Sequence, residues 1–227
     1  MEERTGYIYS VRNIPTKDII NKISKFSSAT LHEAYGKQGA LPSIVKPLDD
    51  SFSLTGPAVT VELQPGDNIV LHKAIYEARS GDILVVDAKG FTEAGVWGAV
   101  MSNAAIKKGI AGIIVYGSVR DKKDIIELGF PVFSVGVCIK GTTKIASGSI
   151  NKPICISDIV IEPGDIVRGD CDGVVVIKYC DINAVGYRAE KIVEKEKKVL
   201  KKIEDGHSTL GIYNFETLSN YNFKQVK

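Results

Sequence analysis

An arginine and an aspartate stand side by side in the stretch AGIIVYGSVRDKKDIIELGFP, residues 111–131, where an apolar run ends. The planar guanidinium of Arg120 suits a carboxylate, and the carboxylate of Asp121 offers the oxygen ligands that hard divalent cations prefer. The pair therefore fits a site that binds an anionic substrate together with a metal ion. A plainer interpretation is that Asp121 caps the helix expected over DKKDIIEL, with Asp124 completing a capping box and Arg120 on the surface.

Side chains that bind softer metals are few in this sequence. There are three histidines and four cysteines, and the cysteines are scattered without C-x-x-C spacing. Neither a zinc site nor a disulfide framework is expected from such a pattern. The cysteines concerned are Cys138, Cys155, Cys171 and Cys180.

The middle of the chain alternates between strands and helices, which predicts parallel strand pairing. Strands are expected over 54–63, 82–88, 111–117 and 131–137, and helices over 65–78, 97–109 and 121–128. In layered α/β folds, ligands bind at the carboxyl ends of parallel strands. The segments VVDAKG and IIVYGSVRD both end in loops of that kind, and the second contains Arg120 and Asp121.

The two ends of the chain have different patterns. Helices are expected over 16–26 and from Thr30, which has capping-box spacing to Glu33. From 153 onward short β runs predict a second, more antiparallel sheet. The last helix is expected over 189–204, with an apolar stripe and a Lys/Glu face. The whole chain, 1–227, is interpreted as one domain, because its length and 44% hydrophobic content suit a single core.

The order of these motifs resembles the RraA-like family, which includes 4-hydroxy-4-methyl-2-oxoglutarate aldolases and regulators of ribonuclease E activity. The resemblance runs from about Thr30 to about Gly206 and includes R-D-x-x-D, the WG loop, GFPVF, GTTK and GD-x-DGVVV. It implies an α/β fold, a three-layer sandwich of β-sheets and helices of the swivelling β/β/α type. It also implies homotrimers or hexamers with active sites between subunits.

For the aldolase members, the resemblance implies class II chemistry with a divalent cation, Mg or Mn, that stabilises a pyruvate enolate. Arg120 would bind the substrate, and Asp121 would hold the metal. Backbone amides of the loop formed by Gly98, Ala99, Val100 and Met101 would bind the substrate carboxylate at a helix start. Glu196 of the last helix would reach the metal site of a neighbouring subunit, with Glu194 as a rival and an exposed helix charge as the plainer alternative.

One position departs from the aldolase pattern. Aldolase members usually have Asp or Glu directly after the loop glycine, but here Gly98 is followed by Ala99. Retro-aldol cleavage needs a base for the 4-hydroxyl proton, whereas decarboxylation of oxaloacetate needs chiefly a Lewis acid. Ala99 therefore favours decarboxylation, or a role outside either reaction. Glu93 and Asp124 are the candidates to replace the missing carboxylate.

Several further residues have both a functional and a structural interpretation. Asp67 either lines the cleft with Asn68 or caps a helix, and the cap is favoured. Asp87 either supports the cleft or satisfies a loop, and Lys144 either meets an acidic substrate or lies on the surface. Trp97 is expected to anchor its loop by packing. His72 is expected to be a partly buried helix residue and not a ligand.

Composition limits the partners. With 29 Lys and Arg against 27 Asp and Glu, the net charge of +2 gives no reason to expect nucleic acid as a partner. The N-terminus lacks the apolar region of a signal peptide, and no apolar run reaches the ~18 residues of a membrane span. A cytoplasmic protein is expected, without membrane contact. The predicted activity is that of a metal-dependent lyase on small 2-oxo acids, and the alternative is a non-catalytic regulator of an RNA-processing enzyme.

Overall fold

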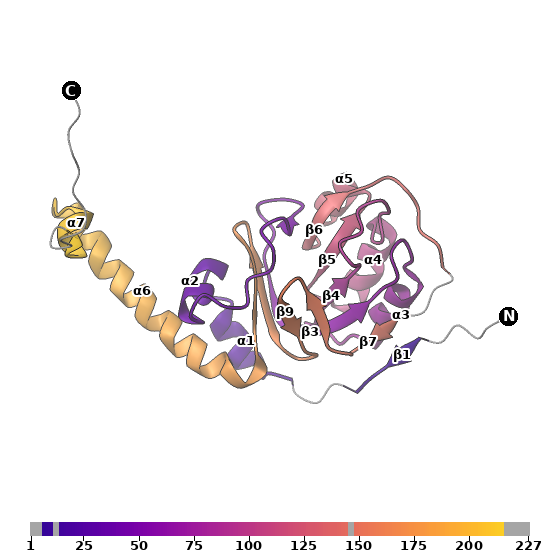
Figure 1. The fold of residues 1–227 in the computed structure, drawn as a ribbon, viewed down its shortest axis with the longest axis horizontal. Helices are drawn as coiled ribbons and strands as arrows, with labels where there is room; N and C mark the ends of the chain where they lie inside the picture. Colours follow the sequence, from indigo (N-terminus) through magenta and orange to yellow (C-terminus); the bar gives the residue numbers. More distant parts are fainter. Residues whose placement is uncertain (1–5, 11–13, 145–147, 216–227) are drawn as a thin grey trace, which may run out of the picture.

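A computed structural model describes residues 6–10, 14–144 and 148–215, and Figure 1 shows their arrangement. Nine strands form the main sheet, and two more form a separate hairpin. The strands are β1 (Tyr7–Ile8), β2 (Lys46–Pro47), β3 (Leu54–Glu62), β4 (Ile83–Asp87), β5 (Gly112–Val119), β6 (Val132–Val137), β7 (Ser149–Ile150), β8 (Ile154–Ile156), β9 (Ile159–Ile161), β10 (Ile166–Asp170) and β11 (Gly173–Ile177).

The helices lie in two groups on either side of the strands (Figure 1). The group next to the parallel strands consists of α3 (Ile69–Glu77), α4 (Ala99–Lys108) and α5 (Lys122–Leu128). The other group consists of α1 (Lys17–Ile23), α2 (Ser28–Ala34) and α6 (Ile182–Glu204), which is followed by α7 (Thr209–Ile212). A short 3-10 helix, η1 (Tyr179–Asp181), leads into α6.

The parallel pairing predicted for the middle of the chain is confirmed. Strands β3, β4, β5 and β6 pair in that order, all parallel, with Val85 opposite Thr60 on one side and Ile114 on the other. The helices between them end as the glycines predict, because Gly109 and Gly129 adopt left-handed conformations at the ends of α4 and α5. This arrangement brings the carboxyl ends of β4 and β5 to one edge of the sheet.

The second sheet is antiparallel as expected, but it is not separate. The first half of β3 pairs antiparallel with β10, while its second half pairs parallel with β4. Strands β10 and β11 therefore join the main sheet through β3, and only the β8–β9 hairpin stands alone. The sequence could not show this sharing, because a buried strand of nine residues has the same pattern with one partner or two.

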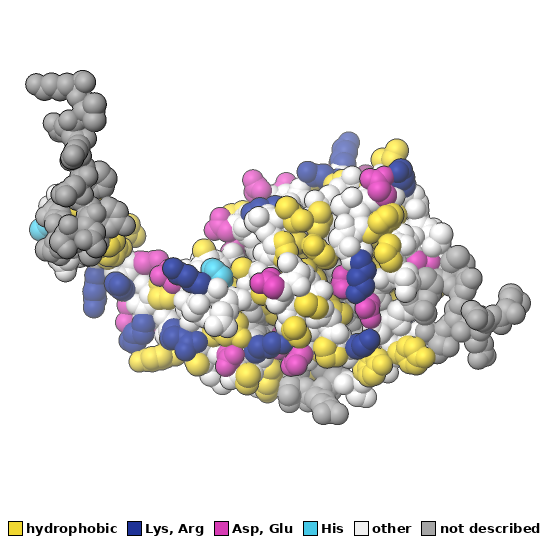
Figure 2. All heavy atoms as spheres, in the orientation of Figure 1, with side chains coloured by type: hydrophobic (Ala, Val, Ile, Leu, Met, Phe, Trp, Pro, Cys, Tyr) yellow, Lys and Arg dark blue, Asp and Glu magenta, His cyan; other side chains and the backbone are white. Residues whose placement is uncertain are grey.

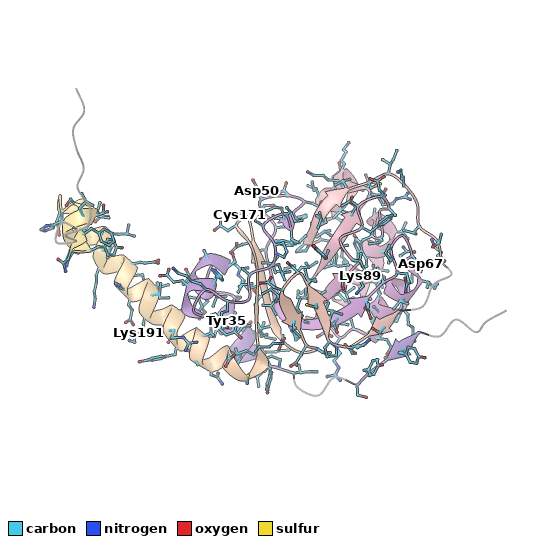
Figure 3. The ribbon with its side chains drawn as sticks, viewed as in Figure 1. Tyr35, Asp50, Asp67, Lys89, Cys171 and Lys191 are labelled. Carbon is cyan, nitrogen blue, oxygen red and sulfur yellow. The ribbon has the colours of Figure 1, made fainter. Side chains whose placement is uncertain are left out.

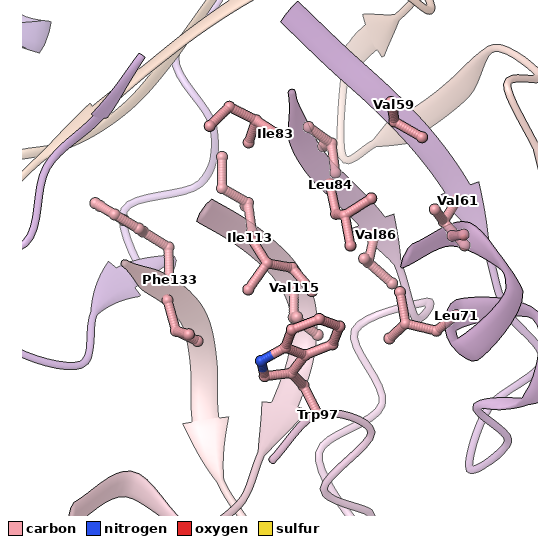
Figure 4. Close-up of a cluster of buried hydrophobic side chains, with 14 of the residues drawn as sticks. Val59, Val61, Leu71, Ile83, Leu84, Val86, Trp97, Ile113, Val115 and Phe133 are labelled. Atoms are coloured by element: carbon pink, nitrogen blue, oxygen red, sulfur yellow. The ribbon is translucent and has the colours of Figure 1, made fainter. Parts of the chain in front are cut away.

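Two apolar clusters lie on opposite faces of β10 and β11. Val167, Val174 and Val176 face the larger cluster, whose centre around Trp97 and Phe133 is drawn in Figure 4. The residues next to these valines in sequence point to the other face, toward the smaller cluster beneath α1, α2 and α6. They are Ile166, Val175 and Ile177. Because side chains alternate along a strand, one hairpin is covered on both faces. The layered α/β architecture expected from the sequence is confirmed.

The helices near the chain ends begin elsewhere than expected. Helix α2 is capped by Ser27, whose Oγ accepts a hydrogen bond from Thr30 N at 3.0 Å, so Thr30 lies inside the helix and is not its cap. Helix α6 begins at Ile182 and not at 189, because one face of its first two turns is buried against α1 and α2, and these turns lack the Lys/Glu pattern. Its later turns extend away from the body, and Lys and Arg side chains gather along it (Figure 2).

Candidate active site

The loop that precedes α4 lies directly against the end of β5. Val96 N donates to Ser118 O at 3.0 Å, and Arg120 N donates to Trp97 O at 2.8 Å. The loop therefore continues the sheet as a short parallel partner of β5. This pairing brings Gly98 and the start of α4 beside Arg120 and Asp121, the neighbours that the family resemblance implies.

Asp121 occupies the N-cap position of α5 but does not cap it. Its φ of 58° is left-handed, and its side chain makes no hydrogen bond to an amide of α5. Instead Oδ2 accepts from Ala99 N at 3.2 Å, and Oδ1 accepts from Arg120 Nε at 3.2 Å. A non-glycine residue in this conformation carries a local strain of order 1–3 kcal/mol, which is typical of functional sites. The interpretation of Asp121 as a side-chain cap of α5 is therefore wrong, and its role in binding a metal ion stays a prediction.

Gly98 allows the carboxylate of Asp121 to approach the start of α4. A Cβ atom on Gly98 would stand 2.5 Å from Asp121 Oδ2 and 3.2 Å from Arg120 Cγ. The glycine backbone is extended, with φ of −153°, so space and not conformation requires the missing side chain. Only glycine at this position leaves the observed arrangement undisturbed.

The first turn of α4 presents backbone amides next to this pair. Ala99 N is held by Asp121, while the amides of Val100 and Met101 belong to the turn in which no intrahelical carbonyl is available. The Val100 side chain is 82% exposed, and Met101 is buried. The positive end of the helix dipole and the guanidinium of Arg120 make this corner favourable for an anion.

Two more segments support the loop from the side. Asn68 is buried and donates to Val96 O at 3.0 Å, while its Oδ1 accepts from Thr142 Oγ1 at 3.0 Å. Asp67, labelled in Figure 3, accepts from Ile69 N at 2.9 Å and from Thr143 Oγ1 at 2.8 Å. Its role at the helix start is the structural one, although the N-cap residue itself is Asn68. The sequence offers Asn68 beside Asp67 as a residue of the cleft, but its hydrogen bonds with the loop were not predictable, because they join segments far apart in sequence.

The carboxylates proposed as substitutes at position 99 have other surroundings. Glu93 is exposed and forms an ion pair with Lys140, which lowers the pKa of its carboxyl group through the hydrogen bond and the charge of that lysine. Asp124 is exposed in the first turn of α5. Neither has a contact with Arg120 or Asp121 among the hydrogen bonds and ion pairs of the described chain.

Lys144, His72 and Asp87 have largely structural surroundings. Lys144 is exposed and donates to Thr142 Oγ1 at 3.3 Å. His72 lies within α3, and burial, with a smaller effect of the Lys144 charge, lowers the pKa of its imidazole. Asp87 is buried and accepts from the backbone and side chain of Lys89 at 2.8 and 2.7 Å, so it satisfies its own loop. Trp97 anchors its loop by packing, as expected, and stacks on Phe130.

Glu196 does not join the site within its own chain. It is exposed on the part of α6 that extends away from the body, as Glu194 is. Glu194 is paired with Lys191, which is labelled in Figure 3, at 3.0 Å. The expected role of Glu196 concerns a neighbouring subunit and stays a prediction.

The donor chemistry of the site fits a hard divalent cation. Asp121 supplies two carboxylate oxygens, each with one hydrogen bond and therefore with further lone pairs available. Magnesium is usually held by one or two carboxylates together with water and substrate oxygens, which matches a single protein carboxylate beside an anion-binding helix start. Asp121 is the residue that would hold the ion.

Comparison with known proteins agrees with this architecture. The profile of the RraA-like family, described as Aldolase/RraA, matches residues 16–176. A protein of Halalkalibacterium halodurans that carries the provisional name of 4-hydroxy-4-methyl-2-oxoglutarate aldolase is 34% identical over 86% of this chain and 93% of its own.

Solved structures give the same result. An uncharacterized protein from Pseudomonas syringae matches with a TM-score of 0.76 and 25% identity, over 87% of this chain and 97% of that one. RraAS2 of Streptomyces coelicolor, described as an unusual member of the RNase ES inhibitor RraA family, matches with a TM-score of 0.74 and 28% identity, over 83% and 99% of the two chains. The chain belongs to the RraA-like family, as its motifs predict.

Among the residues that the structure describes, no helix has both the length and the apolar character needed to cross a membrane.

Proposed function

We propose that this protein is a divalent-metal-dependent lyase acting on small 2-oxo acids, with oxaloacetate decarboxylation as its main reaction and 4-hydroxy-4-methyl-2-oxoglutarate cleavage as a weaker one. The observation that carries the proposal is the orientation of Asp121, whose carboxylate turns from its own helix toward Arg120 and the start of α4. The aldolase name of the relative from Halalkalibacterium halodurans supports the same class of reaction.

Each residue has a distinct part in this reaction. The amides of Val100 and Met101 bind the carboxylate next to the 2-oxo group, and Arg120 donates hydrogen bonds to the 2-oxo oxygen. Asp121 would hold Mg or Mn, and Glu196 of a neighbouring subunit would add a second carboxylate. The cation, when bound, supplies a Lewis acid that draws electron density toward the 2-oxo oxygen. As carbon dioxide leaves, Arg120 stabilises the negative charge that develops there.

Ala99 determines which bond is broken more readily. Aldol cleavage requires a base to take the 4-hydroxyl proton, and the methyl group of Ala99 cannot do so. Loss of carbon dioxide from oxaloacetate needs no such base. The proposal therefore includes a preference for decarboxylation.

The test is pyruvate release from oxaloacetate with Mn, with and without a chelator, after subtraction of the rate with free Mn. Asp121→Asn is the informative variant, because asparagine tolerates the left-handed backbone while removing the charge. We expect it to lose Mn binding by calorimetry together with turnover. Asp124→Asn, on the exposed first turn of α5, is the matched control and should retain both.

Two further variants test the roles of Arg120 and Ala99. Arg120→Ala should reduce kcat/KM by on the order of tenfold to more than a hundredfold, because charge-assisted contacts are worth roughly 1.5–3 kcal/mol each. Ala99→Asp should raise aldol cleavage relative to decarboxylation. Strong aldolase activity of the wild type would show that Ala99 is not limiting, and Mn binding without turnover of any 2-oxo acid would contradict the enzyme proposal.

A second function is favoured by one specific observation. Ala99 removes a carboxylate that aldolase members usually have, and the similar RraAS2 belongs to a family named for inhibition of RNase ES. The alternative proposal is therefore a non-catalytic regulator that binds an RNA-processing enzyme. Binding of a ribonuclease by a protein that turns over no 2-oxo acid would favour this alternative.

A further inference from the structure

Two buried side chains, Trp97 and Ser102, lie beneath the candidate site and are hydrogen-bonded to each other. Trp97 Nε1 donates to Ser102 Oγ at 2.8 Å, and Ser102 Oγ donates to the Gly98 carbonyl at 3.1 Å. Ser102 N donates to the same carbonyl at 3.0 Å. The Gly98 carbonyl therefore has two donors, and both side chains are excluded from solvent.

This contact has a geometric consequence for the site. The peptide bond is planar, so the direction of the Gly98 carbonyl fixes the direction of the Ala99 N–H on the other side of the same plane. That N–H points to Asp121 Oδ2 at 3.2 Å. The hydrogen bonds to the Gly98 carbonyl therefore also fix the Ala99 N–H, which is the donor that orients the Asp121 carboxylate.

Trp97 is also attached to the other half of the site. Its carbonyl accepts from Arg120 N at 2.8 Å, and its ring stacks on Phe130 with centroids 6.1 Å apart. One residue thus connects the end of β5, which carries Arg120, with the start of α4. Its position in the apolar cluster is drawn in Figure 4.

We infer that Trp97 and Ser102 are positioning residues. They hold the Gly98–Ala99 peptide in the orientation that places Asp121 and leaves the Val100 and Met101 amides available for a substrate carboxylate. This inference rests on the proposed function for its relevance to 2-oxo acids, but the orientation of the peptide is testable by itself. If the two side chains only filled the core, their replacement would change stability and leave anion affinity unaltered.

The experiment compares Ser102→Ala with Asn103→Ala, using the full chain. Asn103 is a matched control for the Gly98–Ala99 peptide, because its exposed side chain donates to a different carbonyl one turn earlier in α4, that of Ala99 at 2.9 Å. We expect Ser102→Ala to raise KM for oxaloacetate and Ki for oxalate roughly tenfold, the lower end of the effect of outer positioning groups. The change in kcat should be smaller, and Ile177→Val, in the other apolar cluster, should have the KM and Ki of the wild type.

A second measurement needs no ligand. Hydrogen exchange of the Ala99 amide, which Asp121 protects, should become faster in Ser102→Ala and stay unchanged in Asn103→Ala. Trp97→Phe keeps an aromatic ring, although a smaller one, and removes the N–H donor, so it should produce a change in the same direction. Its effect should not add to that of Ser102→Ala, because both variants break one connection.

The outcomes separate this inference from the proposed function. Absence of turnover in the wild type counts against the lyase, while the exchange of Ala99 still decides the positioning role. Unchanged Ala99 exchange in both Ser102→Ala and Trp97→Phe would overturn the inference. An increase in KM matched by a core variant of equal thermal stability, such as Ile177→Val in the other apolar cluster, would overturn it as well.

Discussion

Asp121 combines two features that are uncommon together, a left-handed backbone and a carboxylate held by groups outside its own helix. The left-handed conformation carries the chain from β5 into α5 while directing the side chain toward the neighbouring helix. Aspartate and asparagine tolerate this conformation better than most residues, because their short polar side chains bond locally. The backbone thus restricts the choice of residue at 121, and the predicted metal restricts it further to aspartate.

Gly98→Ala is the most direct test of the space around this carboxylate. The new Cβ would stand 2.5 Å from Asp121 Oδ2, so the carboxylate has to move. We expect Mn affinity and kcat/KM to fall by about 10- to 100-fold, as for other changes next to metal ligands. Thermal unfolding should change less, because the extended backbone of Gly98 accepts any residue and the atom that has to move is the end of a side chain.

Gly141→Ala is the control for this variant. Nothing lies within 4 Å of the Cβ that it would add, so it should retain the Mn affinity of the wild type. Equal Mn affinity of Gly98→Ala and the wild type would mean that Asp121 does not hold the ion in the orientation described.

At the scale of elements, Tyr35 joins the end of α2 to the start of α6. Its hydroxyl donates to Asp181 Oδ2 at 2.9 Å and accepts from Lys178 N at 3.4 Å. Burial and the hydrogen bond to Asp181 raise the pKa of the phenol from 10.0 to about 12. The phenol therefore stays protonated in the native protein at a pH where it ionises in the unfolded chain.

The sign of the resulting pH dependence follows from proton binding. Between pH 10.0 and about 12 the native state binds more protons at Tyr35 than the unfolded state, so stability decreases as pH rises through this range. Tyr35→Phe should be less stable by about 1 kcal/mol at pH 8, where the hydrogen bond is intact. This difference should shrink toward pH 12. Urea unfolding of both proteins from pH 8 to 12 measures it, and parallel curves would contradict the assignment.

Local sequence features predicted the elements that they control directly. Gly109 and Gly129 end α4 and α5, and the apolar runs of β4 and β5 are buried strands. The adjacency of Arg120, Asp121 and the WG loop was predictable through the family resemblance. The contacts of Ser102 were not predictable, because its only sequence signal is the four-residue spacing from Gly98, which any helix produces. The hydrogen bonds of Asn68 were not predictable either, because they join segments far apart in sequence.

At the scale of the whole molecule, the outer half of α6 extends away from the body, where α7 contacts it, and it leaves apolar side chains exposed. Leu200 is 59% exposed and Ile203 is 40% exposed, and Glu196 is seven residues before Ile203 on the same face. The carboxylate of Glu196 thus lies within an apolar stripe. Such a stripe fits an interface with another copy of the chain, in which a metal ion or a cationic side chain of that copy would balance the charge of the carboxylate. The expected trimer or hexamer would provide that surface.

Mixing two inactive variants tests whether Glu196 acts across subunits. Arg120→Ala and Glu196→Gln should each be at most about a tenth as active as the wild type when expressed alone. Co-expressed, they should recover about a quarter of wild-type activity if subunits assort randomly, because some sites then combine an intact Arg120 with an intact neighbouring Glu196. Repeating the mixture with Glu194→Gln identifies which glutamate acts. No recovery in an oligomer that light scattering shows to be mixed would contradict the role of both.

The strand shared between the two parts of the sheet affects the order in which a newly made chain can fold. Strands β4 to β6 and their helices are close in sequence, but the first half of β3 has to wait for β10, about a hundred residues later. Until the ribosome has released that segment, β3 presents an unpaired edge on which another nascent chain could pair. Chains that end before β10 should therefore aggregate. In refolding of the full chain, pulse-labelled hydrogen exchange should show the amides of β4 and β5 protected before those of the first half of β3.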